Sequence, residues 1–364
     1  MKVLYIVPDI TDSGGIARVV SLKTNYLVEK LNYEICFISV SNSISGCFYD
    51  FNPGIKWYSI KPPKNKLFFI LSYFRFIKKI ISTEKPDIIV VCDAVLWLFI
   101  PWCIKVDVPM IFETHFPKYF EKVKTKSIFN SFRNRIVRFL KKLTITKFTN
   151  TVFVTEEGSK EWNLNKSKVI TNPLSFKVAE GASLVNKKVL AVCMNPYVKG
   201  LDRLLVIWKQ IIEIHPDWIL DVYGDWDVNY EYLNEAKILK IEKNINFIFP
   251  TNDIYNSYIQ SSIFLMTSRH ESFGMVLIES MAIGVPCIAY NGSVGPRTII
   301  KDGLNGFLIE DGNVASYVHK LKNLIEDDNL RFKLGNEARR TVEKHDIDVV
   351  MKEWENLFTE VVGS

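Results

Sequence analysis

The sequence lacks the cysteine and histidine patterns of a disulfide-linked or zinc-binding protein. Six cysteines are scattered along its 364 residues, and none of them forms a CxxC pair. They are Cys36, Cys47, Cys92, Cys103, Cys193 and Cys287. The five histidines form no HExxH or comparable pair. Most of the cysteines lie in apolar runs typical of a reduced core, so we expect no disulfide framework, no metal and no cofactor.

The sequence also lacks a hydrophobic run long enough to cross a membrane. Its longest run, Val95 to Ile104, contains a proline and falls well short of the roughly 20 apolar residues that a spanning helix needs. The first residues, MKVLYIVPDITDSGG, are typical of a strand and its loop, so we expect no signal peptide and a cytoplasmic location.

Acidic residues are nearly absent from one basic stretch. The net charge is only +6, yet residues 118–147 contain ten basic residues and a single acid, Glu121. Within it, residues 127–143 interleave basic and apolar side chains, a pattern that favours contact with an anionic membrane. The residues expected to face that membrane are Arg133, Arg135, Arg138, Lys141 and Lys142. The alternative is a core-facing helix with a solvated basic face, and without a recognition motif nucleic acid is not expected.

Short apolar runs alternate with amphipathic stretches, which predicts parallel sheets covered by helices. In the first half we predict strands at 2–7, 33–40, 86–92, 109–114 and 151–155, with helices at 16–31 and 66–82. The pattern restarts with strands at 188–193, 218–224, 244–249, 262–267 and 285–290, a helix at 201–212 and a helical tail at 314–362. We therefore predict two α/β units in series, with ligands bound in the cleft between them.

Paired glycines follow the first predicted strand and open a helix. Gly14 and Gly15 would let a ligand approach the backbone, and the helix N-terminus would offer N–H groups to an anion. The spacing is not GxGxxG, so the sequence does not match a nicotinamide-binding fingerprint. The alternative is a plain glycine turn.

Two glutamates flank a second predicted helix start. Glu271 lies in a loop, and Glu279 follows eight residues later in a helix expected to begin near Phe273. The positive end of that helix suits a diphosphate. The N–H groups expected there belong to Phe273, Gly274, Met275 and Val276. A carboxylate in an apolar helix is costly unless it is hydrogen-bonded, and sugar hydroxyls are suitable partners for Glu279; the alternative is that Glu279 is merely exposed.

The segment ESFGMVLIE, residues 271–279, resembles the E-x7-E signature of retaining glycosyltransferases of family four. Segments 171–176 and 190–205 resemble the family in the same order, and segment 294–313 is similar to bacterial surface-polysaccharide transferases. The resemblance covers nearly the whole chain. It implies the GT-B fold, in which two Rossmann-like, doubly wound domains face each other across a cleft.

The same resemblance implies domain limits. Residues 1–172 would form an acceptor-side domain, and residues 173–345 would bind the nucleotide sugar. Residues 346–364 would form a C-terminal helix that packs back on the first domain.

The resemblance also implies roles for individual side chains. Glu279 would hold the ribose hydroxyls, Glu271 would contact the donor sugar, and the N–H groups of residues 273–276 would hold sugar and phosphate. Lys199 would neutralise the diphosphate and stabilise the leaving group in place of a metal ion. The family often has an arginine five residues before this lysine, where this chain has Met194.

Two further motifs have competing interpretations. His115, in IFETHFP, resembles the family's histidine on the acceptor side, where it would donate a hydrogen bond to the sugar or orient the acceptor. A structural histidine is the alternative. The segment Asp225–Asp227 looks like the DxD metal motif of a different transferase fold, but a solvent-facing loop is the favoured interpretation.

Together these features imply a retaining hexosyltransferase. It would move a hexose from a nucleotide diphosphate sugar, by family bias a UDP-sugar, to a hydroxyl of a glycan or lipid-linked glycan, as in lipopolysaccharide biosynthesis. It would act without a metal, peripherally on the inner face of the cell membrane. Two alternatives stay open: a nucleotide-sugar epimerase on the same fold, and a non-catalytic membrane-bound partner that binds glycan.

Overall fold

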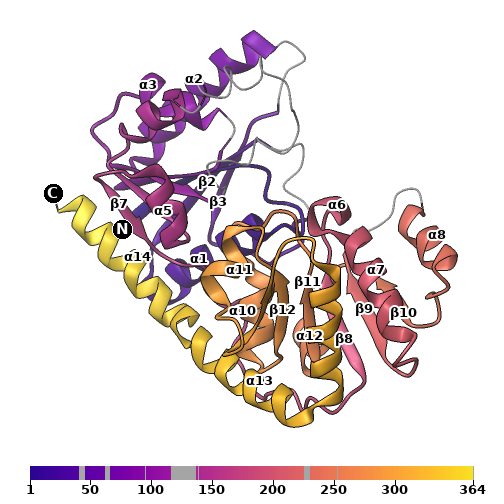
Figure 1. Cartoon of the computed structure of the whole chain (residues 1–364). Coiled ribbons are helices and arrows are strands. Elements are labelled where there is room, and N and C mark those ends of the chain that lie inside the picture. The colour runs from indigo at the N-terminus through magenta and orange to yellow at the C-terminus, as the bar shows by residue number, and fades with distance from the viewer. Residues whose placement is uncertain are drawn as a thin grey trace. The chain divides into compact units, whose positions relative to one another are not determined.

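The computed structural model describes residues 1–40, 46–61, 66–94, 96–115, 137, 139–224, 230–251 and 253–363. The chain divides into two compact units (Figure 1). The first combines Met1–Pro173 with Ile347–Ser364, and the second is the continuous segment Leu174–Asp346. Each unit contains one parallel sheet flanked by helices, which confirms the predicted α/β class.

The sheet of the first unit has seven parallel strands in the order β3-β2-β1-β4-β5-β6-β7. They are β1 (Lys2–Val7), β2 (Glu34–Ser39), β3 (Lys56–Ser59), β4 (Ile88–Cys92), β5 (Met110–Thr114), β6 (Asn150–Phe153) and β7 (Ser167–Val169). The order reverses between β1 and β4, and ligands of open α/β sheets bind beyond the strand ends at such a point. The sequence does not predict β3 and β7, because these edge strands are short and none of their side chains is fully buried.

Helices cover both faces of this sheet. Those described are α1 (Gly15–Leu31), α2 (Lys66–Glu84), α3 (Ile100–Cys103), α5 (Glu156–Trp162) and α14 (Ile347–Val362), with a 3-10 turn η1 (Trp97–Phe99). Alternate residues of β1 point to opposite faces. Tyr5 joins the core formed with α1 and α14, whereas Leu4 joins the core formed with α2.

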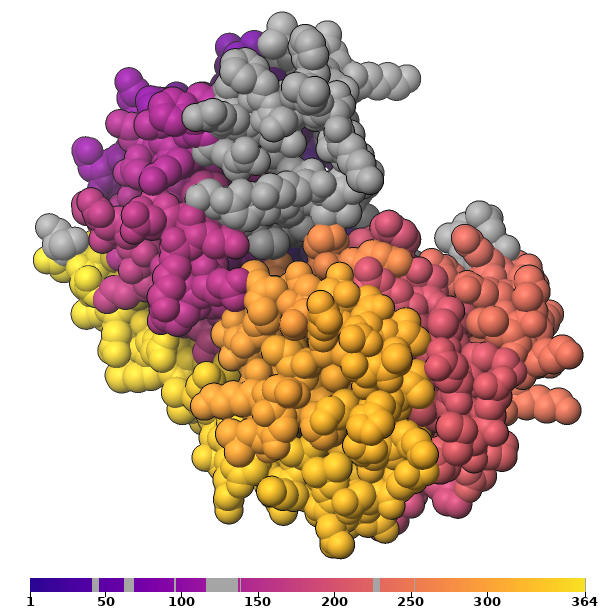
Figure 2. Space-filling view, viewed as in Figure 1, coloured from indigo at the N-terminus to yellow at the C-terminus, as the bar shows by residue number. Residues whose placement is uncertain are grey.

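The C-terminal helix α14 is part of the first unit's core. Its buried residues are Val350, Met351, Trp354, Leu357, Phe358 and Val361. Its outer face lies on the surface, where the C-terminal residues are yellow (Figure 2). On that face Glu360 pairs with Lys168 of β7 at 2.7 Å. The first unit therefore depends on a segment that follows the whole second unit in the chain.

The second unit has six parallel strands in the order β10-β9-β8-β11-β12-β13. They are β8 (Lys188–Val192), β9 (Ile219–Tyr223), β10 (Ile245–Ile248), β11 (Ile263–Met266), β12 (Cys287–Tyr290) and β13 (Gly306–Ile309). The helices are α6 (Pro196–Lys199), α7 (Leu201–Ile212), α8 (Glu231–Ile238), α9 (Tyr255–Ile259), α10 (Met275–Ala282), α11 (Val294–Ile299), α12 (Val314–Glu326) and α13 (Asp328–Val342), followed by a 3-10 turn η3 (Glu343–His345).

The predicted helical tail consists of three helices, of which the expected C-terminal one begins at Ile347. Asp327 ends α12 and caps α13, since its side chain accepts a hydrogen bond from the N–H of Leu330 at 2.9 Å. The turn η3 then separates α13 from α14. Periodicity alone predicts the helical content of this tail but not its breaks.

Candidate functional site

The predicted helix after β11 begins later than expected. We expected its start near Phe273, but α10 begins at Met275, and Gly274 precedes it with φ of +97°. This backbone conformation favours glycine. Phe273 and Gly274 therefore lie in the loop, while Met275 and Val276 open the helix, where N–H groups have no intrahelical partner.

Glu279 is buried and bonded within the protein. It is only 1% exposed, so the alternative of an exposed side chain is wrong. Its Oε1 accepts from the Ser175 hydroxyl at 2.7 Å, and its Oε2 accepts from the Tyr258 hydroxyl at 2.9 Å. It is the fifth residue of α10, slightly over one turn inside the helix rather than two. Protein hydroxyls thus meet the hydrogen-bonding need that the sequence analysis assigned to a sugar.

Lys199 and Glu271 form an ion pair. Lys199 ends the four-residue helix α6, and its Nζ donates to Oε2 of Glu271 in the loop before α10. The side chains keep 21% and 14% of their surface exposed. The structure therefore brings together two of the predicted donor-binding groups, in a place that solvent reaches.

The segment that carries Lys199 packs tightly against the end of β11. Gly200 has φ of +70°, and a Cβ there would lie 2.2 Å from the carbonyl oxygen of Thr267. The Thr267 hydroxyl donates to the carbonyl of Gly200 at 2.9 Å. Only glycine fits at position 200, and this close approach fixes where the Lys199 side chain begins.

Arg269 is a further residue of this site that the sequence analysis missed. Its guanidinium donates to both carboxylate oxygens of Asp202, at 2.7 and 2.6 Å, and to the carbonyl of Tyr197 at 2.7 Å. It also lies over the Tyr197 ring at 4.3 Å. Burial raises the pKa of Asp202, but Arg269 outweighs burial and the pKa is lowered. The only sequence signal was position, since Asp202 and Arg269 closely flank Lys199 and Glu271.

The glycine pair of the first unit opens α1 as predicted. Gly14 precedes the helix and its N–H donates to Oδ1 of Asp12 at 3.0 Å. A Cβ on Gly14 would meet that oxygen at 2.9 Å, whereas a Cβ on Gly15 would meet nothing within 4 Å. The space beside Gly15 is open, at the switch point after β1.

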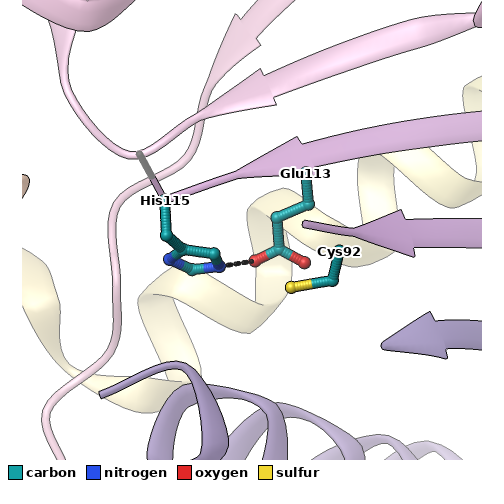
Figure 3. A group of neighbouring side chains, drawn as sticks. All are labelled: Cys92, Glu113 and His115. Atoms are coloured by element: carbon teal, nitrogen blue, oxygen red, sulfur yellow. Dashed lines mark hydrogen bonds and ion pairs between the residues drawn. The ribbon is translucent and has the colours of Figure 1, made fainter. Parts of the chain in front are cut away.

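His115 follows β5 and belongs to a buried charged cluster. Its Nε2 lies 3.0 Å from Oε1 of Glu113, and the same oxygen accepts from Nζ of Lys23 on α1 (Figure 3 draws the histidine and the glutamate). Lys23 and Glu113 are each 1% exposed and His115 is 8% exposed. Neither Lys23 nor Glu113 was predicted from the sequence. Glu113 is a charged residue within an apolar run, whereas Lys23 has mostly polar neighbours in the chain.

The electrostatics of this cluster favour an ionised Glu113. Burial raises the pKa of Glu113, but Lys23 and His115 outweigh burial and lower it to about 2. Nearby, Asp93 accepts from the His115 N–H at 2.6 Å and from the Thr114 hydroxyl at 3.1 Å. Burial raises the pKa of Asp93 to about 6.

Among the described residues, one group of side chains could hold a metal ion: Cys92, Glu113 and His115 (Figure 3). Each offers a potential ligand atom, and these atoms lie within 4.8 Å of one another. Two features of the site disfavour a metal ion. Lys23 already places a cation on Oε1 of Glu113, although Oε2 of the same carboxylate is buried without a hydrogen-bond partner. Burial and then Glu113 raise the pKa of Cys92 well above its ordinary value, which disfavours the thiolate that binds metal.

The predicted membrane face is described in part. Arg133, Arg135, Arg138 and the DxD motif lie outside the described residues. Lys141 and Lys142 lie in a helical stretch, residues 139–145, where Phe139 is 63% exposed. Leu140 and Leu143 on the same stretch are also exposed, as is Trp102, whose Nε1 donates to the Thr144 hydroxyl at 3.0 Å. No helix that the structure describes is long and apolar enough to cross a bilayer.

The sequence of this chain is similar to those of known glycosyltransferases. The family described as glycosyl transferases group 1 matches residues 179–341. An uncharacterized glycosyltransferase of Haemophilus influenzae is 30% identical, with 98% of this chain and 99% of that protein covered. The amylovoran biosynthesis glycosyltransferase AmsD of Erwinia amylovora is 25% identical over 98% of this chain and 99% of its own length.

A solved structure extends the comparison to three dimensions. The structure of Anabaena HepE in complex with UDP and glucose matches with a TM-score of 0.75 and 16% identity, covering 99% of each chain. At that identity the match shows a shared fold. The full-length sequence relative and the family match establish that this chain belongs to the group 1 glycosyltransferases, and the structural match shows that it has the GT-B fold.

Proposed function

We propose that this glycosyltransferase transfers a hexose, with retention of configuration, from a UDP-sugar to a hydroxyl of a glycan or lipid-linked glycan in surface polysaccharide synthesis. The observation that carries the proposal is the Lys199–Glu271 pair beside the start of α10. A relative named for amylovoran biosynthesis supports the polysaccharide assignment, and a structural neighbour solved with UDP and glucose supports the donor.

In the proposed mechanism, donor binding changes the partner of Lys199. The diphosphate carries more negative charge than one carboxylate, so Lys199 would turn to it and stabilise the charge that develops on the leaving group. Glu271 would then accept hydrogen bonds from hydroxyls of the sugar. The N–H groups of Phe273, Gly274, Met275 and Val276 would hold sugar and phosphate.

Two further contacts complete the proposed donor site. Glu279 would bind the ribose hydroxyls after the hydrogen bond from the partly buried Ser175 hydroxyl to Oε1 of Glu279 breaks. The open space beside Gly15 suits close approach of a ligand to the start of α1. His115 would act on the sugar or the acceptor. No metal takes part in this scheme, because Lys199 supplies the positive charge.

The membrane part of the proposal rests on exposed apolar and basic side chains together. Phe139, Leu140 and Leu143 are exposed on the stretch that carries Lys141 and Lys142. Such side chains favour the interface of an anionic bilayer, where each cation contributes about 1 kcal/mol. The protein would bind peripherally to the inner face of the cell membrane, near a lipid-linked acceptor.

Calorimetry with UDP, GDP and ADP, without added metal, tests the donor assignment. We expect UDP to bind with Kd near the micromolar range, about −8 kcal/mol, and the other nucleotides much more weakly. Lys199→Met should weaken this binding. Lys187→Met, which removes an exposed lysine paired with Asp217, is the matched control and should bind normally. Tighter GDP binding would overturn the donor, and absence of all binding would favour the non-catalytic alternative.

Product analysis separates the remaining alternative. A transferase releases UDP only when an acceptor hydroxyl receives the sugar, whereas an epimerase changes the sugar without an acceptor. A Glu271→Ala enzyme that kept full turnover would rule out the assigned site.

A further inference from the structure

The buried cluster of Lys23, Glu113 and His115 is costly for the fold. Lysine and glutamate are almost never fully buried unless they are paired, and a buried pair is often no more stabilising than apolar side chains of similar size. The neighbours of this pair in the core are apolar or aromatic, among them Tyr5 and Trp354, whose ring centroid lies 4.1 Å from Nζ of Lys23. Stability alone does not explain why a charge pair occupies this place.

The chemistry of the cluster determines which nitrogen of His115 carries hydrogen. The ammonium of Lys23 can only donate, and an ionised Glu113 can only accept. His115 Nε2, at 3.0 Å from Oε1 of Glu113, must therefore be the protonated nitrogen of the ring. In the neutral imidazole, Nδ1 is then an acceptor, and it lies on the side of the ring away from Glu113 (Figure 3).

The backbone of His115 is held as firmly as its ring. Its N–H donates to Oδ2 of Asp93 at 2.6 Å, and the hydroxyl of Thr114 donates to Oδ1 of the same carboxylate at 3.1 Å. Asp93 follows β4 with φ of +41°, a left-handed conformation that is unfavourable outside glycine. Two adjacent strand ends thus fix both the position and the rotation of the imidazole.

We propose that Lys23 and Glu113 are positioning residues that hold His115 with Nε2 protonated, so that Nδ1 accepts a hydrogen bond from a hydroxyl of the sugar or the acceptor. This inference rests on the proposed function for its substrate, but the tautomer itself does not depend on it. It also revises the expected role, since a neutral His115 held in this way accepts at Nδ1 rather than donates.

Nitrogen NMR of the histidine-labelled full-length protein tests the tautomer without substrate. His115→Gln identifies the His115 signals by their loss. At alkaline pH we expect Nε2 to carry hydrogen and Nδ1 to be unprotonated. A signal from the Nδ1-protonated form would overturn the proposal.

A pair of double variants separates positioning from folding. Lys23→Met with Glu113→Leu removes both charges and the acceptor for His115, whereas Lys23→Met with Glu113→Gln keeps an uncharged acceptor oxygen at the same place. Both should fold, because neither leaves a buried charge unpaired. With a UDP-sugar and acceptor, we expect the first to lower kcat on the order of 10- to 100-fold with the donor KM changed less than about twofold, and the second to recover part of that loss.

Each outcome bears on the proposal. A mixed tautomer and reduced kcat in the leucine variant, with partial recovery in the glutamine variant, support it. An unchanged tautomer in the leucine variant, or a lost tautomer with unchanged kcat, overturns it. Lys168→Met, which removes the surface pair with Glu360, is the control and should change neither. If no variant, wild type included, turns over a UDP-sugar, the proposed function fails while the NMR result still decides the tautomer.

Discussion

Two lysine–glutamate pairs, Lys23–Glu113 in the first unit and Lys199–Glu271 in the second, differ in how far solvent reaches them. The side chains of Lys23 and Glu113 are 1% and 2% exposed, whereas those of Lys199 and Glu271 are 21% and 14% exposed. Charges in a protein interior interact strongly but cannot regain water if they part. The buried Lys23–Glu113 pair, here called the sealed pair, is therefore suited to holding a neighbouring side chain in place. The partly exposed Lys199–Glu271 pair, here called the open pair, is suited to exchanging one partner for a ligand.

The elements that carry the two pairs also differ in how regular and how buried they are. Lys23 and Glu113 belong to the middle of α1 and to β5, which are regular elements with buried neighbours. Lys199 and Glu271 lie on a four-residue helix and a loop, joined by the hydrogen bonds of Arg269. A loop tied in this way keeps its geometry while its charged side chains remain free to turn.

Removing one member of the sealed pair should have the largest effect. Lys23→Met leaves the Glu113 charge buried without its cation, which should lower the free energy of unfolding by about 3–5 kcal/mol. Urea denaturation measures this loss, and adding Glu113→Leu should restore most of it. A single variant as stable as wild type would contradict the sealed character of the pair.

The stability of Lys23→Met should also depend on pH differently from that of the wild type. In the wild type the pKa of Glu113 is depressed to about 2, so its stabilisation is present above the unfolded pKa and is lost as pH falls from about 4.5 towards 2. Without Lys23, burial should raise this pKa above its unfolded value. The stability deficit of Lys23→Met should then shrink as pH falls below neutrality, which denaturation at a series of pH values checks.

Removing the cation of the open pair should affect turnover more than stability. Lys199→Met should lower kcat on the order of 100- to 1,000-fold, because a group that stabilises developing charge is lost. The free energy of unfolding should change by less than about 1 kcal/mol, since partly exposed pairs contribute little. Steady-state kinetics and denaturation on one preparation test both parts, and a large loss of stability would contradict the comparison.

Arg269 should have an intermediate effect on turnover. Arg269→Leu removes the links to Asp202 and Tyr197, so the Lys199 segment loses its orientation and kcat should fall about tenfold. Arg340→Leu removes an exposed arginine paired with Glu337 and is the matched control. Equal activity of both variants would show that Gly200 and Thr267 alone hold the segment.

The smallest effect is expected at the hydroxyl that covers Glu279. Ser175→Ala removes one hydrogen bond to Oε1. If donor ribose takes that place, UDP binding should tighten slightly, by a few tenths of a kcal/mol, because no hydroxyl must be displaced. Calorimetry checks the sign, and a clear loss of affinity would indicate that Ser175 contacts the nucleotide.

The sequence predicts the buried framework better than its edges. Continuous apolar runs locate β1, β4 and β8 to within a residue or two, since buried parallel strands are apolar on both faces. β13 begins at a glycine and, like the edge strands β3 and β7, was not predicted. The start of α10 at Met275 could not be read either, because the apolar pattern does not show that Gly274 adopts a left-handed backbone.

The sequence likewise predicts some residues of the candidate site and not others. Glu271 and Lys199 lie beside recognisable helix starts, so pattern and resemblance singled them out. Lys23 and Glu113 occupy positions that periodicity assigns to the core, and only the fold shows that they meet across α1 and β5. A charged residue in an apolar run is the signal that would have found Glu113, and a charge at a core position of the helical pattern is the signal that would have found Lys23.

The packing of α14 also sets an order of events during synthesis. Domains commonly fold in the order in which they leave the ribosome. Here the second unit is continuous and can complete its core first, while one face of the first sheet waits for Trp354 and Phe358. Until α14 arrives, Lys23 lacks the aromatic ring that covers it, so the charge pair most sealed in the finished protein is among the last to be shielded from water.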